Sequence, residues 1–280
     1  MTGISVSAYY YKPKVSAEEK ARRDTELRDK IEKVQAEFSG YGYRRIKKHF
    51  DMRGEKINDK RIRRIMKEHG LMPEIKRAYK VTTDSDHDHL IYPNVIKGMV
   101  PSGTDQIWVG DITYIKIATC FVYLAVILDM FSRKVIGWAI SKSLHKSLSL
   151  EALKMAIEER KPNAGCIHHT DRGVQYACEE YTKLLLTNNF IISMSDKGNP
   201  YHNAFAESFM KTLKYEEVYL NDYETYIDVI ERVSYFIEEV YNKKRLHSGI
   251  GYLSPNEFER QHQLNIACKS PLNSEEKHSS

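Results

Sequence analysis

Three acidic side chains spread along the 280-residue chain have the chemistry to hold divalent cations: Asp111, Asp171 and Glu207. Three ionised carboxylates in one cleft would repel each other strongly, and a divalent cation relieves that repulsion. Carboxylate oxygens suit Mg²⁺ or Mn²⁺, which keep part of their water shell and accept phosphate oxygens as further ligands. Two such ions, roughly 3.5–4 Å apart, activate the attacking oxygen and stabilise the leaving oxygen of an in-line phosphoryl displacement. The chemistry open to this set is metal-dependent phosphoryl transfer.

Each acid also has an ordinary structural explanation. Most single carboxylates in a chain of this length lie on the surface, and Glu207 near a helix N-terminus is favourable for dipole reasons alone. Asp129, beside the loop "MFSRK", is a rival metal ligand that we interpret as a turn acid. His168 and His169 precede Asp171, and we expect them to pack or to support the site rather than to bind metal. Composition and spacing leave the metal site and these structural roles open.

The elements that would position the acids begin near residue 105. The segments "QIWVGDITYIKI", "CFVYLAVILDMF" and "KVIGWAI" are rich in β-branched and aromatic residues and predict three successive antiparallel strands. A helix near 147–160, a strand in "GCIHH", a helix near 178–188, a strand in "FIISM" and a last helix follow. This order predicts an α/β fold with a mixed sheet and helices packed on it. Because functional groups gather at strand ends of such sheets, the acids could converge.

The last of these helices, in "GNPYHNAFAESFMKTLKY" (198–215), carries charge on one face. Glu207, Lys211 and Lys214 are spaced i, i+4, i+7, while an apolar stripe faces the other way: Phe205, Ala206, Phe209, Met210 and Leu213. An ion-pair ladder on a solvated helix would explain the pattern. Beside a metal site, the two lysines would instead hold DNA phosphates as point charges.

The N-terminal part is basic. Residues 1–80 contain 22 Lys and Arg against 12 Asp and Glu, a net charge of +10, which leaves −5 for residues 81–280. Apolar periodicity predicts three short helices between about 22 and 70, and Asn58 or Asp59 caps the third. This pattern is typical of a helix-turn-helix module, although a small solvated bundle would also explain it. The candidate DNA contacts are Arg44, Arg45, Lys60, Arg61, Arg63, Arg64 and Lys67.

The C-terminal region predicts a helix from about 222, the loop "NKKRLHSGIGYLS" and a final helix begun by Ser254 and Pro255. Arg245 in that loop is a further candidate DNA contact. No apolar run approaches the roughly 18 residues of a membrane span, so we expect a protein of the cytoplasm with no membrane partner. The expected division is a basic helical domain (1–78), a linker (79–100), a catalytic core (101–218), a helical extension (219–265) and a disordered tail (266–280).

Five motifs in order resemble one known family: "WVGDITYI", "LDMFSRKVIGW", "HHTDRGVQY", "MSDKGNPYHNAFAESFMKTLKYE" and "YNKKRLHSGIGYLSPNEF". They are similar to the OrfB transposases of two-frame bacterial insertion sequences, the insertion-sequence-three family, within the retroviral-integrase-like DDE class. The resemblance spans about 22–262. Asp171 and Glu207 have 35 residues between them, which matches the DD(35)E pattern of that family. The resemblance therefore implies that Asp111, Asp171 and Glu207 are its catalytic triad.

The resemblance also implies a ribonuclease H-like core after an all-α helix-turn-helix domain, with two Mg²⁺ or Mn²⁺ ions as cofactors. The implied activity is cleavage of element ends followed by strand transfer, with duplex DNA of the terminal repeats and of the target as partners. An OrfA fusion or partner, a homo-oligomer on DNA and a bacterial, nucleoid-associated location follow from the same likeness.

Two positions depart from the family pattern. Thr170 stands where the family usually has Ser, and His202 stands where it usually has Asp. The first change keeps a hydroxyl, whereas His202 could weaken metal binding or activity. Two other functions stay open at this point: a non-catalytic DNA-binding regulator, and a metal-dependent ribonuclease H-like nuclease that acts on RNA–DNA hybrids.

Overall fold

The chain divides into two compact units, Met1–Ile75 and Lys76–Ser280. The computed structural model describes residues 15–73, 90–196 and 204–269. Half of the expected linker, residues 79–89, and residues 270–280 of the expected tail therefore lie outside the described residues. The expectation of a disordered tail from 266 is wrong for residues 266–269, which belong to the last helix (Pro255–Lys269). Each unit is described separately below.

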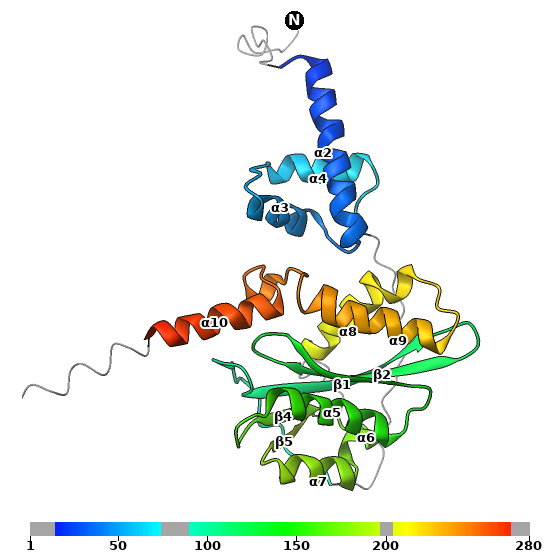
Figure 1. Ribbon diagram of the computed structural model, residues 1–280, viewed down its shortest axis with the longest axis vertical. Helices are drawn as coiled ribbons and strands as arrows, with labels where there is room; N and C mark the ends of the chain where they lie inside the picture. The colour runs from blue at the N-terminus through cyan, green and yellow to red at the C-terminus, as the bar shows by residue number, and fades with distance from the viewer. Residues whose placement is uncertain (1–14, 74–89, 197–203, 270–280) are drawn as a thin grey trace, which may run out of the picture. The chain divides into compact units, whose positions relative to one another are not determined.

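The described part of the first unit consists of three helices and their connections (Figure 1): α2 (Ala17–Glu37), α3 (Tyr43–Met52) and α4 (Asp59–Glu68). Asn58 caps α4, because its side chain accepts a 2.8 Å hydrogen bond from the Lys60 N–H. Gly70 follows the end of α4 with a positive φ of 66°. The apolar residues whose spacing predicted the first and third helices are buried: Leu27, Ile31, Val34, Phe38, Ile62, Ile65 and Met66. Tyr41, Ile46 and Phe50 join them in the core. The three predicted helices are confirmed.

The described part of the second unit contains a five-stranded mixed sheet in the order β3-β2-β1-β4-β5. Its strands are β1 (Ile107–Lys116), β2 (Phe121–Asp129), β3 (Val135–Ser141), β4 (Ile167–Thr170) and β5 (Ile191–Met194). The first three form the predicted antiparallel meander, whereas β4 pairs in parallel with β1 and with β5. This is a ribonuclease H-like core, as the sequence predicted.

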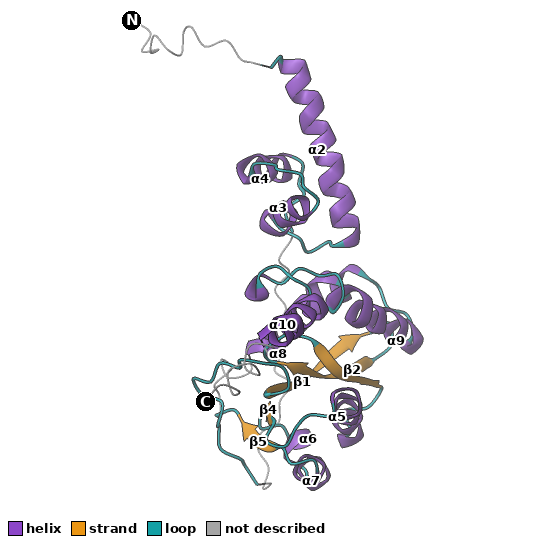
Figure 2. Cartoon of the chain, turned by 60° about the vertical axis from the view of Figure 1, so that its left-hand side comes forward, coloured by secondary structure: helices purple, strands orange, loops and turns teal. Residues whose placement is uncertain are grey.

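Helices cover both faces of the sheet (Figures 1 and 2). One face holds α5 (Lys146–Arg160), α6 (Val174–Ala177) and α7 (Glu179–Thr187), and the other holds α8 (Ala204–Glu216) and α9 (Tyr226–Tyr235). The short α6 was not predicted. After α9 come a π-helical turn (Phe236–Tyr241) and α10 (Pro255–Lys269), which begins where the Ser-Pro signal predicted. Among the described helices, none is long and apolar enough to cross a membrane.

Two close contacts hold β3 in place. A Cβ atom on Gly137 would lie 2.3 Å from the Ala152 carbonyl oxygen, so only glycine lets α5 pack so close to this strand. On the other side, the Asn242 side chain donates to the Val135 carbonyl at 2.9 Å and accepts from its N–H at 3.0 Å. The sheet that carries the acids is thus fixed to helical layers on both faces.

Candidate active site

Two of the three predicted catalytic acids are brought together by strand register. In the parallel pair of β1 and β4, Ile107 lies opposite Ile167 and Val109 opposite His169. Asp111 lies two residues after the last pair of this register on β1, and Asp171 directly follows the end of β4, so both acids lie at the same end of the paired region. Because β4 ends at Thr170 while β1 continues to Lys116, the sheet opens beyond this point.

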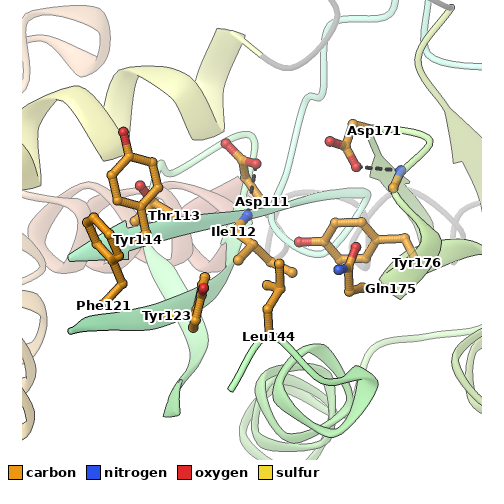
Figure 3. Close-up of a pocket in the computed structure, with 11 residues that line it drawn as sticks. Asp111, Ile112, Thr113, Tyr114, Phe121, Tyr123, Leu144, Asp171, Gln175 and Tyr176 are labelled. Carbon is orange, nitrogen blue, oxygen red and sulfur yellow. Dashed lines mark hydrogen bonds between the residues drawn. The ribbon is translucent and has the colours of Figure 1, made fainter. Parts of the chain in front are cut away.

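A cavity of about 230 Å³ occupies that opening, and both aspartates line it (Figure 3). The remaining lining residues come from β1, β2 and the segments before α5 and around α6: Ile112, Thr113, Tyr114, Phe121, Tyr123, Leu144, Gly173, Gln175 and Tyr176. The Asp111 carboxylate accepts a 2.8 Å hydrogen bond from the Ile112 N–H, and the Asp171 carboxylate accepts one of 2.9 Å from the Gly173 N–H. Backbone donors therefore orient both acids at the cavity.

Negative charge is disfavoured at this place. Burial, followed by the charges of Asp171 and Glu207, raises the pKa of Asp111 to about 8, against the opposing effects of the Ile112 N–H and Lys214. Burial also raises the pKa of Glu207. The pKa of Asp111 therefore responds to the charges of both other acids, whereas the pKa of Glu207 is raised by burial alone.

Helix α8 brings Glu207 and Lys214 toward the strand that carries Asp111. Its core stripe is as predicted, with Ala206, Phe209, Met210 and Leu213 buried and Phe205 half-buried. The Lys214 ammonium lies 4.6 Å from the centre of the Tyr114 ring, and burial lowers its pKa while Asp111 raises it. Lys211, one turn earlier, is exposed. Of the two predicted lysines, Lys214 is therefore the one beside the acids.

The two carboxylates at the cavity suit a divalent cation. Both line the same cavity, and burial penalises the negative charge of Asp111, so this pair fits a hard cation such as Mg²⁺ or Mn²⁺. Across the three described ranges, however, no group of three His, Cys, Asp or Glu side chains is arranged to hold a metal. Glu207 is exposed in the first turn of α8, directly after the undescribed segment 197–203. Asp111 and Asp171 thus form the assembled part of the site.

The rival acid and the two histidines have structural roles. Asp129 is fully buried and accepts hydrogen bonds from the backbone N–H groups of Asp105, Phe131 and Ser132, as expected for a turn acid. His168 is bonded to the Tyr181 hydroxyl at 2.8 Å, and His169 to the Ser193 hydroxyl at 2.8 Å. Their packing role is confirmed.

The predicted DNA contacts of the first unit fall into two groups. Arg44 and Arg63, from α3 and α4, converge on the ring of Tyr43, with guanidinium carbons 5.4 and 5.6 Å from its centre. These two arginines, together with Lys60 and Lys67, are exposed. Arg45 is half-buried beside the Tyr41 ring, at 5.7 Å.

The other group holds the bundle together. The guanidinium groups of Arg61 and Arg64 both pair with Asp24 of α2, at 2.8 and 2.5 Å. Their charge is partly neutralised within the unit, which the sequence pattern did not predict. The exposed set is therefore the stronger candidate for a DNA surface.

Arg245 requires a correction. Its side chain is only 3% exposed and donates two hydrogen bonds, of 2.7 and 2.6 Å, to the Glu216 carboxylate at the end of α8. The loop that carries Arg245 folds back onto α8, so the guanidinium fixes that loop. We therefore replace the expected DNA contact by a structural role.

Sequence reasoning missed the aromatic residues of the cavity. Tyr176 is 3% exposed, and among the described residues none accepts from or donates to its hydroxyl. A buried polar group left without a partner costs about 1–3 kcal/mol, so this hydroxyl has to be explained. The available signal was an aromatic residue shortly after each aspartate, in "DITY" and "DRGVQY".

Of the two residues that depart from the family pattern, Thr170 lies among the described residues. The Thr170 hydroxyl donates to the Asp171 backbone carbonyl at 3.0 Å, so the residue before the acid uses the hydroxyl that the change retains. His202 lies outside the described residues.

Three models of known families match the chain. Integrase core domains match residues 101–200 and 189–255, and an HTH-like domain matches residues 22–79. Together they cover both units of the chain.

Two transposases are similar to this chain over most of its length. A transposase for insertion sequence element IS904 of Lactococcus lactis is 37% identical over 236 residues, covering 84% of this chain and 93% of the relative. Transposase InsF for insertion sequence IS3A of Escherichia coli is 35% identical over 222 residues, 79% of this chain and 77% of the relative. A solved integrase catalytic core domain of HTLV-2, in complex with magnesium, is 16% identical with a TM-score of 0.44, covering 56% of this chain and 98% of that one.

Proposed function

The chain belongs to the insertion-sequence-three family of transposases, polynucleotidyl transferases with an integrase core, and from this premise we propose how its residues carry out the reaction. Asp111, Asp171 and Glu207 hold two divalent cations, Mg²⁺ or Mn²⁺, against a DNA strand. The observation that carries the proposal is that Asp111 of β1 and Asp171, directly after β4, line the same cavity.

Each residue has a distinct part in this proposal. Asp111 and Asp171 are preset by their backbone N–H donors, and Glu207 completes the ligand set from α8. Bound cations would lower the pKa of the attacking oxygen and balance charge on the leaving oxygen. Lys214 holds a DNA phosphate next to Asp111, and the exposed Lys211 extends this contact along the strand. No covalent intermediate with the protein is needed.

The first unit and the assembly complete the proposal. Arg44, Lys60, Arg63 and Lys67 hold the backbone of duplex DNA at the terminal repeats, with residues 1–78 acting as the DNA-binding domain and 101–218 as the catalytic core. Two element ends must meet with a target, so the working complex contains more than one protomer. An OrfA product joins it as a fusion or a partner, and the reaction takes place on DNA in the bacterial cytoplasm.

The direct test is the Asp171→Asn variant, which keeps size and shape but loses a metal ligand. We expect cleavage of duplex DNA bearing the terminal repeats to be abolished, DNA binding to be kept and Mn²⁺ binding in calorimetry to weaken at least tenfold. Asp222→Asn, at an exposed acid after α8, is the matched control. Cleavage by Asp171→Asn at the wild-type rate would reject the proposed site.

The same assay separates the transposase from the two alternatives. A regulator would bind the repeats without cleaving them under any metal, and a hybrid-specific nuclease would cut RNA–DNA hybrid faster than duplex DNA. Family membership and the HTH-like match favour duplex DNA as the substrate.

A further inference from the structure

The cavity beside the acids is lined by aromatic and aliphatic side chains as well as by Asp111 and Asp171. Beyond Asp111 it is walled by Tyr114, Phe121 and Tyr123, here called the aromatic wall. Tyr114 and Tyr123 are direct partners across β1 and β2, and the rings of Tyr114 and Phe121 meet edge to face at 5.4 Å. Ile112 and Leu144 line the same cavity (Figure 3). A hydrated ion gains no binding energy from aromatic side chains, whereas a flat π-system gains binding energy by stacking on them.

Tyr176 stands across the cavity from the aromatic wall. Figure 3 shows its hydroxyl directed inward, on the side of Asp111 and Ile112. This hydroxyl is the enclosed group for which the described residues supply no hydrogen-bond partner. A hydroxyl both donates and accepts, and the neighbouring Gln175 amide can do the same. The cavity thus offers aromatic faces on one side and a hydrogen-bonding edge on the other.

The size of the cavity narrows the choice of ligand. Its 230 Å³ corresponds to about eight water molecules at ~30 Å³ each, and lies below the roughly 300 Å³ at which pockets for drug-sized ligands begin. A flat heteroaromatic group of about ten atoms fits this range. A nucleobase is such a group, with π-faces and a polar edge.

The charges nearby set where that base would belong on a strand. Lys214 lies over the outer residue of the aromatic wall, Tyr114, and interacts electrostatically with Asp111. A phosphate held by Lys214 at the acids would leave the adjoining base next to the wall. The base at the aromatic wall and the phosphate at the acids then belong to a single nucleotide.

We propose that this cavity is a nucleobase subsite that takes one unpaired base from the strand being cut, stacked on the aromatic wall and hydrogen-bonded by Tyr176 and Gln175. The subsite rests on the proposed function, because it assumes that the acids face a DNA strand. A base inside a duplex cannot reach such a cavity, so the base next to the cleaved bond leaves the stack. Removing a base from the stack costs free energy, and binding this base in the cavity would offset part of that cost and hold the phosphate at Asp111 and Asp171.

The test couples a change in the protein to a change in the DNA. Fluorescence anisotropy in metal-free buffer measures the affinity for duplex DNA carrying the element end, with each of the nucleotides around the cleaved bond made abasic in turn. For the wild type, one position should cost about tenfold in affinity when its base is removed. Tyr176→Phe should lower affinity for intact DNA about threefold, and Tyr123→Ala about tenfold.

The decisive result is non-additivity. On DNA abasic at the sensitive position, Tyr176→Phe and Tyr123→Ala should cost less than twofold, because the base they contact is already absent. Tyr235→Phe, at a 55% exposed tyrosine on α9, is the matched control and should bind every DNA like the wild type. Equal losses on intact and abasic DNA, or no sensitive position, would overturn the subsite. Because the assay needs no cleavage, Asp171→Asn can fail its own test while this coupling is still measured.

Discussion

Two aspartates on neighbouring strands show how differently the same side chain is used. Asp129 ends β2 and Asp111 lies within β1, and both are removed from most solvent. Asp129 accepts from three backbone N–H groups and has Arg160 at 3.9 Å. Asp111 accepts from its neighbour Ile112 and feels the charges of Asp171 and Glu207. One carboxylate is satisfied by the fold, and the other is left in need of positive charge.

The pKa values record this difference. Burial raises the pKa of Asp129 to about 6, where backbone donors and Arg160 limit the rise, whereas Asp111 reaches about 8. A buried charge that the protein does not neutralise is a cost that evolution removes unless a ligand supplies the missing charge. A structural acid is therefore recognised by the hydrogen-bond donors around it, and a ligand-binding acid by a shortage of such donors.

The largest expected effect comes from Asp111→Asn. The change keeps the acceptor for Ile112 N–H but removes the charge that would bind metal, so cleavage should fall by about 10³-fold or more. Denaturant unfolding of the metal-free variant should show no loss of stability. If the variant cleaves at more than a tenth of the wild-type rate, Asp111 is a structural acid like Asp129 and not a metal ligand.

Asp129→Ala should show the opposite behaviour. Three backbone donors lose their acceptor and Arg160 loses a nearby charge, so the free energy of unfolding should fall by about 3–5 kcal/mol. In a thermal melt this corresponds to a midpoint lowered by roughly 10 °C. If the folded fraction still binds metal as the wild type does, the two acids have separate functions. Weakened metal binding with no loss of stability would show instead that Asp129 belongs to the metal site.

The pH dependence of stability offers a smaller effect that belongs to Asp111. A pKa raised to about 8 means that the folded protein keeps a proton which the unfolded chain has lost, so stability falls as pH rises toward 8. Between pH 6.5 and 8 Asp129 is mostly ionised. The pKa of His168 is lowered by burial to about 3, so this side chain is neutral in the folded protein, while a fraction that shrinks as pH rises is protonated in the unfolded chain; this opposing effect is the same in wild type and in Asp111→Asn. Metal-free wild type should lose up to about 1 kcal/mol per pH unit in this window.

Asp111→Asn should flatten that slope, and Asp129→Asn should leave it unchanged. Unfolding midpoints in urea across the window measure both. Adding Mg²⁺ should restore the stability of the wild type most at the highest pH, because protons and metal compete for the same oxygens. A slope that persists in Asp111→Asn would assign it to another group.

How well the sequence predicts the environment of each aspartate depends on how far apart along the chain the contacting residues lie. Local periodicity was sufficient for the strands, the meander and the core stripe of α8, because each depends on neighbours along the chain. Asp129 could also be interpreted correctly, since its donors Phe131 and Ser132 lie two and three residues away. The meeting of Asp111 with Asp171 needed the register of two strands 60 residues apart, which only the resemblance supplied.

Other parts of the site depend on contacts that leave no local signal. Arg245 is basic and in a loop, but its partner Glu216 is 29 residues earlier, so its burial was not foreseen. Arg61 and Arg64 likewise pair with Asp24 of another helix. The aromatic wall of β1 and β2 comes to face Tyr176 of α6 only after the sheet has formed. Long-range pairing therefore decides which charged residues stay available for DNA.

The smallest expected effect concerns Lys214, which lies near Asp111. The question is whether this lysine binds DNA, or whether it stabilises the fold as Arg160 does beside Asp129. Arg160, at Asp129, donates to Asp105 at 2.8 Å and is fixed in the fold, whereas Lys214 rests on the Tyr114 ring. Lys214→Gln should therefore leave the unfolding midpoint unchanged, weaken DNA-end binding about two- to fivefold and lower the salt slope of binding by about one. Lys214→Arg, which keeps the charge, should recover most of the affinity. A loss of stability in Lys214→Gln, with binding unchanged, would instead make Lys214 the counterpart of Arg160 and remove the contrast between the two aspartates.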